Sequence, residues 1–291
     1  MRRYDVGRQQ LLDLIGAEKS NWIGRARTRT GEYKQARAYT GGSEFWGEIK
    51  GVYIRLQHEK CAYCETKLQG AALASKVHEV EHFRPKSSVK AWPPSKRPDY
   101  LSDFAPSWSL GPDSDTGYYC LAYHPFNYAI ACTRCNSTLK SNFFPVRGPR
   151  DVNGEDPSHM QVEEALLVYP ISDIDEDPAR IITFHGVTAM PAQSSGYAYE
   201  RAVTTIRFFQ LNHEDLTTRR AALLMPLWLN LEDLAQDAGG GNSQAKQRAV
   251  DRACDARSEF SRCMEAFRSL HQTDSAEAKR LAEFAETLTG G

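Results

Sequence analysis

Two Cys-x-x-Cys pairs constrain this chain more than any other feature of its sequence. Cys61 and Cys64 form the first pair, Cys132 and Cys135 form the second, and 67 residues separate Cys64 from Cys132. Zinc in structural sites takes four ligands at the corners of a tetrahedron, and two such turns supply four thiolates. We therefore expect a structural Zn²⁺ site made by all four cysteines. The gap exceeds the ~15–20 residues of common zinc modules, so a redox pair and four unrelated core cysteines stay open as alternatives.

The bulk composition is that of a globular protein. The 291 residues are 41% hydrophobic and 25% charged, close to globular averages. No apolar run approaches the ~18 residues of a membrane span, and the opening "MRRYDVGRQQ" lacks the apolar body of a secretory signal. We expect a cytoplasmic protein without a membrane partner. In that reducing compartment we predict that Cys254 and Cys263 are small buried hydrophobes on opposite faces of one helix.

Charge is segregated along the chain although the net charge is only -1. Residues 82–97 hold five Lys or Arg and no acid, and residues 132–150 hold four and none. Residues 151–179 hold nine Asp or Glu and no Lys or Arg. A locally positive surface beside the cysteines would suit a polyanion such as a nucleic acid.

The pattern of apolar residues predicts a mainly helical chain with one segment of strand, turn and strand. We expect a helix over about 6–18, a polar and basic loop over 21–43, and a helix over about 43–59. Residues 88–117 are expected to be irregular. Residues 166–184 predict strand, turn and strand. Helices follow from about 198, one of them capped by Asn212 and a long one over 243–270. The expected divisions are 1–43 (helix and basic loop), 44–150 (core with the cysteine site) and 151–291 (mainly helical, a surface for a partner or for self-assembly).

Polar residues with metal or acid–base chemistry lie near both cysteine pairs. Glu81 and His82 stand in "HEVEHFRPK", between the pairs. Asn127 precedes Cys132 by five residues, and Asn136 follows Cys135 directly. An isolated Glu-His pair is usually an exposed strand without a role. Here it is accompanied by two asparagines at defined distances from a candidate zinc site.

The segments "CAYCE", "EHFRPK" and "YYCLAYHPFNYAIACTRCNSTLKSNFFPV" together resemble the HNH endonuclease family, which has a zinc-bound ββα-metal core. More narrowly, they are similar to the HNH nuclease subunit of Septu-type and retron-associated antiphage systems, whose partner is an ATPase. The resemblance covers roughly residues 45–220. It implies an α+β fold, in which a small ββα-metal core holding the four-cysteine zinc site is embedded in a mainly helical chain. It also implies an endonuclease that hydrolyses phosphodiester bonds as the effector of a bacterial defence complex, with DNA favoured over RNA as substrate.

The resemblance assigns a role to each polar residue. His82 matches the general base that takes a proton from water. Glu81 and Asn136 match the ligands of one catalytic divalent ion, and their oxygen donors suit Mg²⁺ or Mn²⁺. Asn127 matches the residue whose amide holds the loop and orients the histidine. The family more commonly has Asp before the histidine, where this chain has Glu81. The last metal ligand of the family is often His, where this chain has Asn136.

Four basic residues are the candidate nucleic-acid contacts, because cations beside the metal can hold the backbone without recognising bases. They are Arg84, Lys86, Arg134 and Lys140. An ordinary solvated surface is the alternative for each. His124 is either a second ligand or a packed side chain, and His78 would line the groove. A non-catalytic zinc-stabilised nucleic-acid-binding or scaffolding module is the alternative function.

Overall fold

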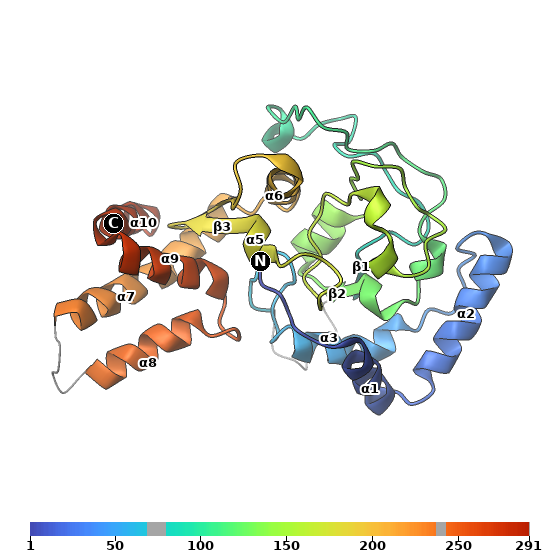
Figure 1. The fold of residues 1–291 in the computed structure, drawn as a ribbon, viewed down its shortest axis with the longest axis horizontal. Coiled ribbons are helices and arrows are strands. Elements are labelled where there is room, and N and C mark those ends of the chain that lie inside the picture. The colour runs from blue at the N-terminus through green and yellow to red at the C-terminus, as the bar shows by residue number, and fades with distance from the viewer. Residues whose placement is uncertain (69–79, 237–242, 291) are drawn as a thin grey trace.

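The computed structural model describes residues 1–68, 80–236 and 243–290 (Figure 1). Within these ranges the fold is α+β and mainly helical, as predicted. The α-helices are α1 (Arg8–Glu18), α2 (Trp22–Ala36), α3 (Lys50–Leu56), α5 (Pro178–Ile181), α6 (Gly196–Phe208), α7 (Glu214–Gln236), α8 (Ser243–Cys254), α9 (Ser261–Thr273) and α10 (Ser275–Leu288). The 3₁₀ turns are η1 (Trp46–Ile49), η2 (Asp99–Leu101), η3 (Tyr119–Leu121), η4 (Pro125–Asn127), η6 (Pro157–His159) and η7 (Gln161–Glu163).

Two short antiparallel strand pairs lie in different parts of the molecule. Strand β1 (Val80–His82) pairs with β2 (Tyr128–Ile130), and β3 (Ile182–His185) pairs with β4 (Thr188–Pro191). A π-helix, η5 (Arg134–Lys140), follows β2 closely. Figure 1 shows β1 and β2 among α1–α3 at one end of the molecule and α7–α10 packed together at the other. No helix in the described ranges is both long enough and apolar enough to cross a lipid bilayer.

The predicted loop over residues 21–43 is wrong, because most of it forms α2. Trp22, Ala26 and Tyr33 are the buried residues of this helix, and the Trp22 indole donates a hydrogen bond to the Phe45 carbonyl at 3.1 Å. The arginines and threonines between these three positions conceal the apolar face in the sequence. The predicted helix over about 6–18 is confirmed as α1.

The predicted strand, turn and strand over 166–184 is only partly correct, since β3 pairs with β4 and not with residues 166–169. The carbonyls of that earlier segment are bound by side chains of α6: Thr205 donates to Leu166 at 3.1 Å, and Arg201 to Leu167 at 3.0 Å. These contacts satisfy the buried backbone without a partner strand.

The single long helix predicted over 243–270 is two helices, α8 and α9. The chain turns between them, with the Asp255 side chain accepting from Arg257 N and Phe260 in the left-handed region at φ 51°. Cys254 and Cys263 therefore lie in different helices, and both are buried as predicted.

The predicted helix cap at Asn212 is also wrong. Its amide bonds both backbone groups of Ala189 in β4, at 2.7 and 2.9 Å.

Candidate metal centre and active site

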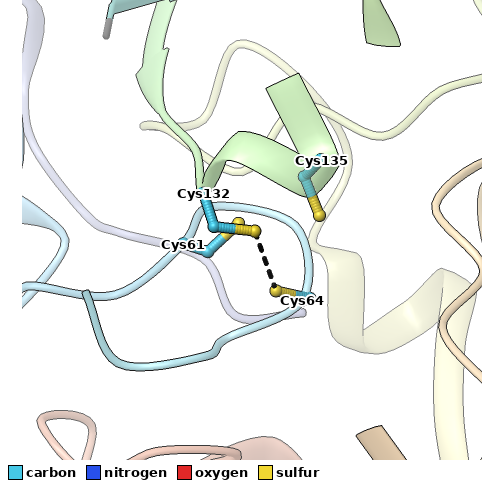
Figure 2. Close-up of side chains that lie close together, drawn as sticks. All are labelled: Cys61, Cys64, Cys132 and Cys135. Carbon is cyan, nitrogen blue, oxygen red and sulfur yellow. Dashed lines mark hydrogen bonds between the residues drawn. The ribbon is translucent and has the colours of Figure 1, made fainter. Parts of the chain in front are cut away.

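The four cysteines of the two pairs come together in one cluster. Their Sγ atoms all lie within 4.8 Å of one another, and none of the four is in a disulfide. Figure 2 shows the side chains converging from the 61–64 turn, from the residues just before η5 (Cys132) and from η5 itself (Cys135), with the Cys64–Cys132 contact of 3.8 Å dashed. Zn–S bonds of ~2.3 Å in a tetrahedron put sulfurs about 3.8 Å apart. The cluster therefore fits a structural Zn²⁺ with all four positions filled by protein.

The first cysteine turn is held against β2 by Gln57, a fully buried residue at the end of α3. Its amide nitrogen donates to the carbonyls of Lys60 and Ile130 at 2.9 and 2.8 Å, and its amide oxygen accepts from Ile130 N at 2.8 Å. Ala62 N also donates to the Ile130 carbonyl. One side chain thus fixes the distance between the turn and the strand that leads to the second cysteine pair. Gln57 could not be predicted as a functional residue, because nothing in the sequence around it distinguishes it from a surface glutamine.

A buried arginine supplies positive charge beside the cluster. Arg220 in α7 is 1% exposed, and its guanidinium donates to the carbonyls of Val187 and Leu211. In the described residues no carboxylate lies within ion-pair distance of it. Burial lowers the pKa of Arg220, against the opposing effect of Cys263, Cys64 and the more distant Glu65. A cation buried without a carboxylate partner is expensive. Four thiolates around one Zn²⁺ would carry a net charge of −2, which would stabilise this cation.

Strands β1 and β2 bring Glu81 and His82 beside the helical segment that begins at the second cysteine pair. The register pairs Glu81 with Ala129 and His82 with Tyr128. Asn136 lies directly after Cys135 in η5, and its backbone N donates to the Cys132 carbonyl at 2.9 Å. Because the second cysteine pair forms the start of this helix, a metal held by the cluster would also fix where Asn136 lies.

A polar cavity of about 220 Å³ joins three of the four predicted catalytic residues. Its lining residues are Val80, Glu81, His82, Pro85, Lys86, Asn136, Ser137, Ser141 and Asn142. Glu81 and His82 are 55 and 54 positions from Asn136 in the sequence, so their meeting is a product of the fold.

Asn127, the fourth predicted residue, lies outside that cavity and is completely buried. Its amide oxygen accepts from Arg84 N at 2.8 Å, and its amide nitrogen donates to the carbonyls of Arg84 and Leu121 at 3.0 and 3.1 Å. These three bonds tie η4, which contains Asn127, to the segment after His82 and to the last residue of η3. The side chain therefore holds the backbone at this point, and its role in orienting His82 stays a prediction.

His82 is held as a neutral ring. Its Nε2 lies 3.0 Å from the Ala122 carbonyl, which can only accept, so Nε2 carries the proton and Nδ1 carries the lone pair. Burial lowers the pKa of His82 to about 3, with the positive charge of Lys86 acting in the same direction. Trp46 and Tyr128 meet the ring edge-on at centroid distances of 4.8 and 5.1 Å. The ring is thus fixed in the protonation state that a general base requires.

Glu81 is a buried carboxylate with an incompletely satisfied oxygen. Burial raises the pKa of Glu81 to about 7, against the opposing effect of Lys140. The Lys140 ammonium lies 3.3 Å from Oε1, yet that oxygen has no hydrogen-bond partner among the described residues. An under-satisfied carboxylate oxygen and an amide from Asn136 in one polar cavity are hard oxygen donors that fit Mg²⁺ or Mn²⁺.

Two of the four basic residues predicted to contact nucleic acid are in buried ion pairs. Arg84 is 6% exposed and its Nε lies 2.9 Å from Glu163, and Lys140 is fully buried against Glu81. Their contacts are internal, which does not favour a phosphate contact for either.

The other two basic residues are partly exposed. Lys86 lines the cavity, and Arg134 donates to Gln210 at 2.7 Å.

The two additional histidines of the sequence analysis do not join this cavity in the described structure. His124 lines a separate cavity of about 460 Å³, and its Nδ1 accepts from Phe126 N at 3.2 Å. Burial lowers the pKa of His124 to about 4, which agrees with a packed, neutral side chain. His78 lies outside the described residues.

The fold and site together define a mixed α+β protein in which a four-cysteine cluster supports a two-stranded sheet, a short helix and a polar cavity. Among curated proteins, 173 residues of the chain match the Septu protein PtuB of Bacillus mycoides (strain KBAB4) at 26% identity. The match covers 60% of this chain and 50% of that relative, so the chain spans about half of its length. No protein-family model matches the chain, and no solved structure matches it.

Proposed function

We propose that the chain is a metal-dependent HNH-type endonuclease that hydrolyses phosphodiester bonds, with DNA favoured over RNA. The observation that carries this proposal is the meeting of Glu81, His82 and Asn136 in one polar cavity beside the four-cysteine cluster. An acid, a neutral histidine and an amide are what hydrolysis with one divalent ion requires. The β1, β2 and η5 elements supply two strands and a helix in the order that the resemblance implies.

In this proposal each residue performs a separate task. Nδ1 of His82 accepts a proton from the attacking water, while the Ala122 carbonyl keeps the ring oriented through Nε2. Glu81 and Asn136 would hold a divalent ion, which would supply positive charge to the scissile phosphate and the leaving oxygen. Lys140 compensates the Glu81 charge from inside the protein. Lys86, at the cavity, contacts the phosphate backbone. Zn²⁺ held by the four cysteines would have no open position and would be structural.

The similarity to a Septu protein supports a role as effector in a bacterial antiphage defence system. In that role we propose an ATPase partner subunit and a cytoplasmic location. The mainly helical region 151–291 would then provide the surface for that partner or for self-assembly. The division of the chain at residues 44 and 151 also stays a prediction.

Cleavage of plasmid DNA and of total RNA by the purified protein tests the proposal. We expect cutting with Mg²⁺ or Mn²⁺ that disappears with EDTA and in His82→Ala. It should persist in His185→Ala, a matched histidine variant in β3. The preferred polymer identifies the substrate class. A folded, zinc-loaded protein that leaves both polymers intact would refute catalysis by this chain alone and favour the non-catalytic zinc module.

A further inference from the structure

Two aromatic rings surround the ammonium group of Lys86 at the cavity. Nζ lies 4.6 Å from the ring centroid of Trp46 and 5.3 Å from that of Tyr39. Both distances are within the range of a cation–π interaction. Tyr39 belongs to the segment between α2 and the predicted nuclease core, and Trp46 lies at the start of that core. We refer to Tyr39 and Trp46 as the aromatic cage.

Trp46 also contacts the ring of the proposed general base. Its indole meets His82 edge-on, with centroids 4.8 Å apart and an angle of 88° between the planes. Tyr123 packs against Trp46 at 5.5 Å, so the indole is supported by the aromatic cluster beneath it. One side chain is therefore in contact with both the cation and the base of the same cavity.

The backbone of Lys86 is fixed as firmly as its side chain. Gly117 N donates to the Ser87 carbonyl at 2.9 Å, and Tyr118 N donates to the Pro85 carbonyl at 2.8 Å. The approach is so close that a Cβ on Gly117 would lie 2.6 Å from backbone atoms of Pro85, Lys86 and Ser87. The backbone on both sides of Lys86 is therefore hydrogen-bonded to residues 117 and 118.

We propose that Trp46, with Tyr39, is a positioning residue that holds the Lys86 ammonium at the cavity to bind a backbone phosphate of the nucleic acid. The inference rests on the proposed function and assigns a task to two aromatic side chains at the N-terminal edge of the predicted core. A lysine fixed before binding loses less side-chain freedom when it contacts the phosphate. The contact recognises no base, so it strengthens binding to all sequences alike.

A double-mutant cycle on binding tests this inference without any cutting. The probe is a labelled DNA duplex, bound to zinc-loaded protein in the His82→Ala background without added Mg²⁺ or Mn²⁺, over a series of salt concentrations. Lys86→Gln removes one phosphate contact and should reduce the slope of log K against log salt by about 1. Trp46→Leu should reduce this slope by the same amount. The double variant should bind the duplex no more weakly than Lys86→Gln alone.

Conservative variants separate positioning from general packing. Trp46→Phe keeps an aromatic face and should restore most of the binding, whereas Tyr39→Leu should reproduce part of the loss if Trp46→Leu does not fold. Lys90→Gln is the matched control, because Lys90 lies in the same basic stretch, 6.0 Å from the Phe143 ring, and does not line the cavity. It should change the slope much less.

Three results would overturn the inference: an unchanged salt slope in folded Trp46→Leu, additive losses in the double variant, or no binding by the His82→Ala protein that carries both rings. Absence of cutting by the parent protein would instead refute the proposed function. The two failures are distinguishable because the binding cycle uses a protein that is not required to cut.

Discussion

Replacing Asn127 by alanine should destabilise the protein strongly, although the side chain touches neither the cavity nor the cysteine cluster. The substitution removes three buried hydrogen bonds at once. It leaves Arg84 N without its partner, and an unsatisfied buried donor costs about 1–3 kcal/mol. The carbonyls of Arg84 and Leu121 each lose a bond with a net value of about 1 kcal/mol. We expect a loss of about 4 kcal/mol in the free energy of unfolding.

Urea unfolding of the zinc-loaded protein measures this loss as a lower midpoint at an unchanged slope. Asn127→Asp should lose at least as much free energy of unfolding. A carboxylate can still accept from Arg84 N, but its second oxygen would face the carbonyls of Arg84 and Leu121, to which it cannot donate. Asn142→Ala is the matched control, because that amide makes one longer bond, 3.2 Å to Ser88, in a partly buried setting. It should cost less than about 1 kcal/mol. Equal stability of Asn127→Ala and the parent would refute the structural role assigned to this amide.

Three further predictions concern pH, the metal and the approach of two loops. The unfolded His124 ring binds a proton near pH 6.5, whereas burial lowers the pKa of the folded ring to about 4. The free energy of unfolding should therefore fall as the pH drops below about 6.5, by about 2 kcal/mol at pH 5. Urea unfolding at pH 7 and pH 5 measures this loss, and His124→Gln should remove the part that comes from His124. Cys135→Ser should abolish stoichiometric zinc in elemental analysis and unfold the core. Cys254 is a buried cysteine outside the cluster, so Cys254→Ser should keep the metal. A full zinc content in Cys135→Ser would contradict the four-cysteine site. Gly117→Ala should cost about 1–3 kcal/mol in thermal unfolding because backbone atoms stand where its Cβ would lie, and a neutral result would show that the two loops can separate freely.

The features that could be predicted from the sequence are those with fixed spacing and distinctive residue types. Two Cys-x-x-Cys turns are rare enough to predict that Cys61, Cys64, Cys132 and Cys135 meet, and their convergence is confirmed. The helix α1 followed from apolar periodicity, and the α+β class followed from the resemblance. Zinc occupancy, the catalytic ion and the roles of the polar residues stay predictions.

Other features depended on partners distant in the sequence. Nothing near Arg84 shows that its guanidinium pairs with Glu163, 79 residues away, instead of facing solvent. The carbonyl of Leu166 is satisfied by a threonine side chain in α6, so local strand propensity gave the wrong pairing. Trp46 was expected in a helix, but its contact with Lys86 and His82 depends on where the segment after α2 lies. A tertiary contact decided the outcome in each case.

The most direct test of the catalytic cavity is the Mg²⁺ dependence of strand cleavage by the parent and by Glu81→Gln, both zinc-loaded and equally folded. The account predicts that the neutral amide, which keeps the size of the side chain but removes its charge, raises the Mg²⁺ concentration needed for half-maximal cutting or lowers the rate by at least about 100-fold. Cutting by Glu81→Gln at the parent rate and with the parent's Mg²⁺ requirement would contradict the assignment of the ion to this cavity.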